Sequence, residues 1–219
     1  MKKKEKTSGA LKNELFERYP ALQFCRQDFE AAYECLLSSY RSNGKLLIAG
    51  NGGSAADSEH MVGELMKSFL FFRELNPHFV SRLEAEYGED GLELAKLLEG
   101  GLPAIPLTSM PAISTACAND VAGYVTFAQL VYTLGNEGDV FFGISTSGNS
   151  KNILLAIMAA KAKGMKSICL TGRTGGKCME LCDICVRVPE DETFKIQELH
   201  LPVYHTLCAM LEADLFVER

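Results

Sequence analysis

Short apolar runs alternate along this chain with longer segments whose apolar residues recur at helical spacing. The short runs predict strands, because four to six apolar residues between turn signals are typical of strands buried on both faces. They are Lys45–Ala49, Ala104–Leu107, Asp139–Ile144, Lys166–Leu170 and Ile184–Val188. The helical patterns between and after them are Ser54–Phe69, Phe127–Leu134, Ser150–Ala162, Lys177–Leu181 and Phe194–Phe216. The alternation predicts an α/β fold: a three-layer, five-stranded parallel sheet flanked by helices, in a single domain over residues 1–219.

Two segments do not follow this alternation of predicted strands and helices. Residues 10–42 show helical spacing throughout and predict a long N-terminal helix that Pro20 splits or kinks. This helix packs either on a partner subunit or on the sheet of its own chain. Residues 70–101 predict a helical insertion, with Ser81–Glu99 as its helix. The insertion is a lid, an oligomer contact or a solvated surface segment.

Composition narrows the function classes. The formal net charge of −6 over 219 residues argues against nucleic acid as the main ligand. No run of 18 apolar residues occurs, so no membrane-spanning helix is expected. The lysine-rich start lacks a following apolar stretch, so it is not a secretion signal. The eight cysteines are scattered, and Cys182 and Cys185 are interpreted as a helix end running into a strand. A cytoplasmic location is therefore expected.

A glycine turn follows the first predicted strand and suits an anion. Backbone N–H groups can approach a ligand closely there, and a helix start adds partial positive charge. Ser54 is expected to cap that helix. His60 and Glu64 follow on one helix face, so an acid/base or metal pair lies beyond the anion site. The turn residues predicted to bind substrate are Asn51, Gly52, Gly53 and Ser54.

The third strand ends in a segment rich in hydroxyl groups. Parallel sheets bind ligands at the carboxyl ends of their strands, and hydroxyls at a helix start suit a phosphate monoester. These residues are Ser145, Thr146, Ser147 and Ser150. The glycine-rich segment Thr171–Lys177 does not form a nucleotide P-loop, because Thr171 and Cys178 replace residues that motif needs.

The last helix carries Gln197 and His205, eight residues apart. Pro202 lies between them and is expected to kink the helix and help them converge. Alternatively, His205 serves the site of a neighbouring subunit.

These residues together resemble the sugar-isomerase (SIS) domain family and, within it, the bacterial phosphoheptose isomerases. The resemblance covers most of the chain outside the N-terminal tail and residues 70–101. Its motifs are Gly50–Ser54, His60 with Glu64, Asn119-Asp120, Gly143–Ser150, Leu170–Gly176, Arg187–Pro189, and Gln197-Glu198 with His200 and His205.

The resemblance implies a flavodoxin-like core and isomerisation of sedoheptulose 7-phosphate to D-glycero-D-manno-heptose 7-phosphate. It also implies a homotetramer with sites at subunit interfaces. Asn119 and Asp120, expected in a loop, and Gln197 are then substrate-binding residues. Zinc is implied as the metal, held by residues matching His60, Glu64, Gln197 and His205.

The implied aldose–ketose isomerisation needs a base at carbon, an acid at oxygen and a group that stabilises the enediolate. For this reaction we assign Glu64 as the base and His205 as the group that moves the oxygen-bound proton.

The chain departs from the family pattern at Phe194, where an Asp is common, and at Lys67-Ser68, where Gly-Arg is common. These changes leave open the alternative that the chain is an isomerase of a different phosphosugar. A second alternative is a non-catalytic phosphosugar-binding or protein-binding SIS module, of the type that associates with the bacterial replication initiator. That type lacks the residues matching Glu64 and His205, so their presence here favours an enzyme.

Overall fold

The computed structural model describes residues 7–216, whose strands form one parallel sheet. Its order, β2-β1-β3-β4-β5, is the flavodoxin-like order. The short β2 lies at an edge, where Pro106 costs no hydrogen bond to a further strand. The strands are β1 (Leu46–Gly50), β2 (Ala104–Pro106), β3 (Val140–Ser145), β4 (Lys166–Thr171) and β5 (Ile184–Arg187). The predicted five-stranded α/β fold is confirmed.

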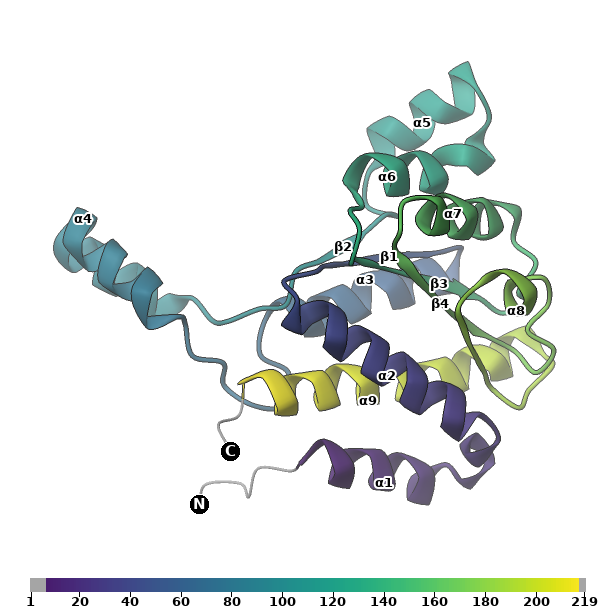
Figure 1. Ribbon diagram of the computed structural model, residues 1–219, viewed down its shortest axis with the longest axis horizontal. Coiled ribbons are helices and arrows are strands. Elements are labelled where there is room, and N and C mark those ends of the chain that lie inside the picture. The colour runs from purple at the N-terminus through teal and green to yellow at the C-terminus, as the bar shows by residue number, and fades with distance from the viewer. Residues whose placement is uncertain (1–6, 217–219) are drawn as a thin grey trace.

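Successive residues of each central strand enter different cores. Leu46 and Ile48 contribute to one core, and Leu47 and Ala49 to the other. This period of two explains why the strands read as continuous apolar runs. The first core is covered by α2 (Arg26–Arg41), α3 (Gly53–Met66) and α9 (Thr193–Phe216), and the second by α6 (Thr126–Leu134), α7 (Lys151–Ala162) and α8 (Cys178–Leu181) (Figure 1).

Proline divides the predicted N-terminal helix. Helix α1 (Ser8–Arg18) is followed by a 3-10 helix (Pro20–Cys25) and then by α2. Helix α1 packs on α9, and Leu11, Leu15 and Phe16 are buried there. These helices therefore cover the core of their own chain, and packing on a partner subunit stays a prediction.

The insertion is an arm that extends away from the sheet (Figure 1). Its helix α4 (Pro77–Leu97) contains a break at Gly88, where φ is 57° and ψ is −129°. After the break, Gly91 lies against the carbonyl group of Leu83, so the second half of α4 folds back on the first. At the base of the arm, the N–H of Gly100 donates to the carbonyl of Arg73 at 2.9 Å. The predicted helical insertion is confirmed.

Several element bounds differ from the prediction by a few residues; the insertion helix, predicted at Ser81–Glu99, is Pro77–Leu97. Two differences concern the site. Helix α3 ends at Met66 rather than Phe69, because the Glu212 carboxylate accepts the backbone N–H groups that a longer helix would use. Asn119 and Asp120 lie in the last turn of α5 (Pro111–Asp120) rather than in a loop. Pro111 has the fixed φ that suits the first position of this helix. A short 3-10 helix (Gly123–Val125) follows. No helix in residues 7–216 has the length and apolar character needed to cross a membrane.

Candidate active site

The glycine turn joins β1 to α3 at the carboxyl edge of the sheet. Gly52 precedes the helix with a φ of 56°, a left-handed conformation that glycine adopts without strain. The capping position therefore belongs to Gly52, and the predicted cap, Ser54, is wrong. Ser54 lies buried in the first turn, and its N–H donates to the carbonyl of Asn51 at 3.0 Å. Gly52 and Gly53 are exposed at the helix start, where an anion can approach the backbone.

Helices α3 and α9 run side by side in the same direction. The Gln197 amide lies over Gly53, and the Tyr204 hydroxyl lies 3.2 Å from Oδ1 of Asp57. One turn further, the Cys208 thiol faces the carbonyl of Met61. Residues further along α9 therefore contact residues further along α3. Helix α9 stays continuous through Pro202, so convergence on α3 comes from the parallel course of the two helices.

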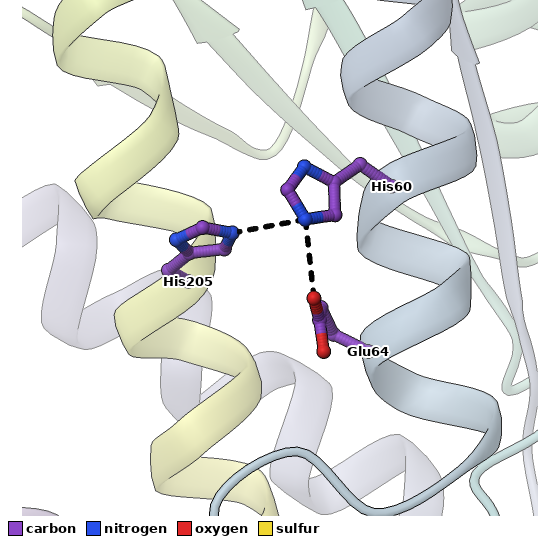
Figure 2. A group of neighbouring side chains, drawn as sticks. All are labelled: His60, Glu64 and His205. Carbon is purple, nitrogen blue, oxygen red and sulfur yellow. Dashed lines mark hydrogen bonds and ion pairs between the residues drawn. The ribbon is translucent and has the colours of Figure 1, made fainter.

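Three side chains converge along this seam (Figure 2). Nε2 of His60 lies 3.1 Å from Oε1 of Glu64 and 3.3 Å from Nε2 of His205. The imidazole rings of His60 and His205 meet edge to face, with centroids 4.8 Å apart. His60 is 46% exposed and Glu64 21%, so a ligand can reach both. Glu64 and His205 of one chain therefore share one site.

Tyr204 orients the ring of His60. Its hydroxyl donates to Asp57 and lies 3.1 Å from Nδ1 of His60. Because the hydroxyl has one proton, which Asp57 accepts, Nδ1 of His60 is the donor to the tyrosine oxygen. Nε2 of His60 is then left with its lone pair toward Glu64 and His205. The sequence analysis did not identify Tyr204, since tyrosine in an apolar helix is typical of core packing.

The three side chains fit a divalent metal. His60, Glu64 and His205 each offer a ligand atom, and these atoms all lie within 4.8 Å of one another. Two imidazoles and a carboxylate are a known donor set of catalytic zinc. A cation shared by these three atoms would satisfy all of them at once. Burial and the neighbouring His60 lower the pKa of His205, which favours the neutral imidazole that binds metal.

The fourth predicted ligand, Gln197, lies elsewhere along the seam. Its amide nitrogen packs on Gly53. His60 lies seven residues later on α3, a rise of about 10 Å. The structure therefore brings three of the four predicted metal ligands together, and the role of Gln197 as ligand or substrate contact stays a prediction.

The serine segment forms a tight turn between β3 and α7. Ser145 is buried and donates to Oγ of Ser150 at 3.0 Å, while Ser147 is exposed. Gly148 has a φ of 64°, and its N–H donates to the carbonyl of Ser145 at 3.0 Å. This turn lies beside the glycine turn, because Asn51 and Asn152 exchange two side-chain hydrogen bonds of 3.0 and 2.8 Å. Asn152 was not identified from sequence.

The glycine-rich segment after β4 supports the serine turn. The N–H of Gly172 donates to the carbonyl of Thr146, and the N–H of Cys178 donates to that of Gly148, both at 2.9 Å. A Cβ atom on Gly148 would lie 2.0 Å from the carbonyl oxygen of Gly175. The glycines here permit close contact between two backbone segments.

Asn119 and Asp120 lie apart from this seam. They are exposed at the end of α5, and the amide of Asn119 donates to Asp120 at 2.7 Å. Helix α5 lies beside α6, on the other side of the sheet from α9 (Figure 1). Their predicted role in substrate binding stays a prediction.

A cleft of about 370 Å³ opens on the α1 side of His205. Its walls come from α1, α9 and the segment after α3, and they are largely apolar. They include Leu11, Leu15, Phe69, Pro202 and Thr206. His205 is thus reached from two directions, from the cleft and from the His60 side.

Comparison with known proteins identifies the family. Residues 91–172 match the SIS domain model. The chain is 41% identical over 177 residues to the phosphoheptose isomerase of Aneurinibacillus thermoaerophilus, covering 81% of this chain and 76% of the relative. It is 42% identical over 183 residues to that of Burkholderia pseudomallei, covering 84% and 80%.

A solved structure agrees with these relatives. The phosphoheptose isomerase of Neisseria gonorrhoeae aligns with a TM-score of 0.71 and 31% identity, over 92% of this chain and 94% of that one. Similarity of this extent covers the sheet and the α3–α9 seam together. The chain belongs to the phosphoheptose isomerase family of SIS-domain proteins.

Proposed function

We propose that this isomerase converts sedoheptulose 7-phosphate to D-glycero-D-manno-heptose 7-phosphate. The observation that carries the proposal is the convergence of Glu64 and His205 from two helices onto one exposed site. The names of its relatives, which are phosphoheptose isomerases, support the substrate. The turns after β1 and β3 are suited to hold the phosphate, through hydroxyl groups and the N-terminus of α3.

The reaction moves a proton between adjacent carbons through an enediol. The Glu64 carboxylate takes the proton from one carbon and returns it to the next. The His205 imidazole, whose pKa burial lowers from its ordinary value, moves the proton between the two substrate oxygens. Tyr204 and Asp57 hold the His60 ring so that its Nε2 faces the same site. A metal held by His60, one Glu64 oxygen and His205 would polarise the substrate carbonyl and stabilise negative charge on oxygen. The second Glu64 oxygen would stay available as the base, and His205 would carry a proton only at a ring nitrogen that does not ligate the metal.

The proposal extends to the setting of the enzyme. We assign zinc as the metal, the cytoplasm as the location and a homotetramer with interfacial sites as the assembly. Support for the assembly is the family resemblance and the exposed side chains of Phe72, Tyr87 and Leu97 on the arm and at its base.

The test is turnover of sedoheptulose 7-phosphate, with aldose formation followed by NMR in the presence of zinc and of a chelator. We expect aldose to form in the metal-loaded protein and to stop on chelation. Other ketose phosphates run in parallel, and turnover of one of them instead would reassign the substrate. No turnover of any substrate in any metal form would refute the isomerase.

A matched pair of variants separates the enzyme from a non-catalytic module. Glu64→Gln keeps the shape of the side chain and removes the base, so we expect kcat to fall about 10²- to 10⁴-fold. Glu59→Gln is the control, because Glu59 lies on the same helix and contacts Thr108 and Ser109 instead. Full activity of the Glu64→Gln variant would contradict the assignment of the base.

A further inference from the structure

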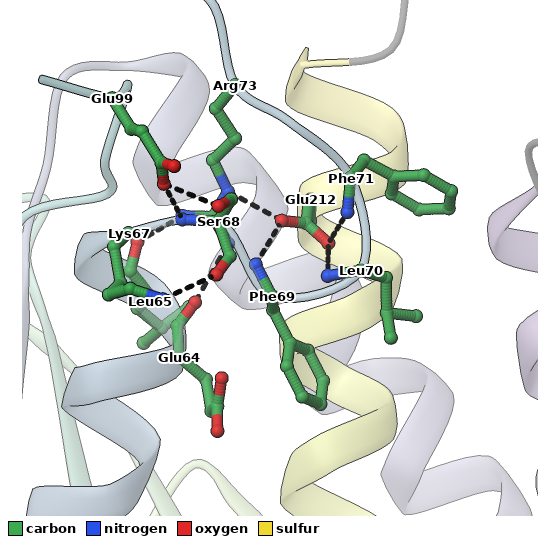
Figure 3. Close-up of polar contacts among 10 residues, drawn as sticks. All are labelled: Glu64, Leu65, Lys67, Ser68, Phe69, Leu70, Phe71, Arg73, Glu99 and Glu212. Atoms are coloured by element: carbon green, nitrogen blue, oxygen red, sulfur yellow. Dashed lines mark hydrogen bonds and ion pairs between the residues drawn. The ribbon is translucent and has the colours of Figure 1, made fainter. Parts of the chain in front are cut away.

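A fully buried ion pair lies at the far end of the α3–α9 seam (Figure 3). Nε of Arg73 lies 2.8 Å from Oε1 of Glu212, and both side chains are 0% exposed. Arg73 lies at the base of the arm, and Glu212 lies on α9. Removing two charges from water is costly, so such a pair persists only where further hydrogen bonds satisfy it. The hydrogen bonds of this pair show which segments of the chain it connects.

Glu212 holds the segment that leaves α3. Its Oε1 accepts the N–H of Phe69 at 2.7 Å, and its Oε2 accepts those of Leu70 and Phe71 at 2.7 and 3.2 Å. Three consecutive backbone donors thus turn toward one carboxylate on α9. Helix α3 stops there, and the chain after it is fixed to the helix that carries His205.

Arg73 holds the C-terminus of α3. Its Nη2 donates to the carbonyl of Glu64 at 2.8 Å, and its Nη1 donates to that of Leu65. The last carbonyl groups of a helix have no partner within the helix, and a helix end without partners frays. The guanidinium is a partner for two of these carbonyl groups, and one of them belongs to Glu64, the residue that we assign as the base.

We propose that Arg73 and Glu212 are positioning residues that set the relation of Glu64 to His205. The inference rests on the proposed function and deepens it. Glu64 lies in the last turn of α3, and Arg73 fixes its backbone. His205 lies seven residues before Glu212 on α9, about 10 Å of helix. The ion pair joins these two anchor points across the seam.

A purely structural role fits the pair less well. A buried ion pair contributes less to stability than apolar residues of the same volume in many proteins. Apolar side chains at 73 and 212 would fill the space without directing any bond to Glu64. The bond from Arg73 to the backbone of Glu64 is therefore the feature that needs an explanation.

The test uses the full chain and the double variant Arg73→Met with Glu212→Gln. It removes both charges together, so no charge stays buried alone, and the amide oxygen introduced at position 212 can still accept a backbone N–H. Arg73→Lys is the second variant, since it keeps the charge and the fold but cannot reach both carbonyl groups of α3. The matched control is Asp139→Asn. Asp139 is 5% exposed, pairs with Lys45, and lies at the opposite, amino edge of the sheet.

The readouts are the melting temperature, the affinity and visible spectrum of bound Co²⁺, and kcat and KM separately. We expect the Arg73 variants to bind Co²⁺ about 10- to 100-fold more weakly, with an altered spectrum and a loss mainly in kcat. The control should lose thermal stability and keep wild-type cobalt affinity and kcat.

Two results would overturn the inference. One is unchanged cobalt affinity and kcat in both Arg73 variants, and the other is an equal loss in the Asp139→Asn control. A wild-type protein that binds no Co²⁺ and turns over no phosphosugar would refute the proposed function, and the inference with it. That outcome is distinguishable, because it is seen before any variant is made.

Discussion

Individual histidines on α9 show how strongly the surroundings decide chemistry. His205 faces His60 and Glu64, whereas His200 is fully buried and neither of its ring nitrogens has a hydrogen-bond partner among the described residues. Burial lowers the pKa of His200 to about 4, and the nearby backbone of Thr171 opposes that shift only in part. His200 is therefore neutral in the folded protein at neutral pH, and it has a structural rather than a proton-transfer role.

Replacing His200 with Leu should make the free energy of unfolding depend less on pH below 6.5. The folded-state pKa lies below the ordinary value of 6.5, so His200 supports folding fully above pH 6.5. That contribution is lost as the pH falls from 6.5 toward 4, and it amounts to about 3 kcal/mol by the shift in pKa. Urea unfolding of wild type and His200→Leu at pH 7, 5.5 and 4.5 measures the difference. Parallel pH curves for the two proteins would contradict the assignment.

Sequence reasoning identified the side chains that we propose to react and missed those that orient them. Spacing and residue type selected His60 and Glu64, and the family resemblance joined His205 to them. Arg73 and Glu212 are separated by 139 positions, and each alone is typical of a solvated charge. Only the folded chain shows that both are buried. Tyr204 and Asn152 were missed for the same reason, because their partners are distant in sequence.

At the scale of elements, the two turns at the carboxyl edge depend on close backbone contact. The apolar runs predicted every strand, since burial on both faces leaves a continuous signal. They did not predict α5, whose residues Pro111–Asp120 are mostly small or polar and largely exposed. Nor did they show that the serine turn rests on the glycines after β4. Contacts between two loops leave no periodic pattern in either one.

Gly148→Ala should weaken phosphate binding more than it weakens the fold. Its Cβ atom would lie 2.0 Å from the carbonyl oxygen of Gly175, so one of the two loops must move. We expect KM for the phosphosugar to rise about tenfold or more, a loss of about 1.4 kcal/mol in binding. Gly138→Ala is the control, because Gly138 also has a positive φ, 87°, but nothing lies within 4 Å of its Cβ position. An equal rise in KM for both variants would attribute the effect to backbone strain alone.

At the scale of the whole molecule, the two edges of the sheet carry different groups. Its amino edge carries the Lys45–Asp139 pair, and its carboxyl edge carries the turns and the α3–α9 seam. A metal bound at the seam would join α3 and α9, two helices that are far apart in the sequence. It should therefore stabilise the folded chain as a whole and not only the site.

Adding zinc should raise the melting temperature of chelator-treated protein. A ligand at 100 times its dissociation constant stabilises the folded state by about 2.7 kcal/mol. At 219 residues this corresponds to a shift of roughly 5–10 °C. His205→Asn should abolish the shift, and His78→Asn, on the exposed arm, should leave it intact. A shift that survives His205→Asn would place the metal elsewhere.

The arm has a consequence of a different kind. Its outgoing and returning segments are fastened at the core by the bonds from Gly100 to Arg73 and from Leu102 to Leu65, beside the buried ion pair. A swing of residues 77–97 about these two bonds would leave the backbone of α3 and α9 in place. The arm can therefore adjust its angle to a neighbouring subunit while His60, Glu64 and His205 keep their separation.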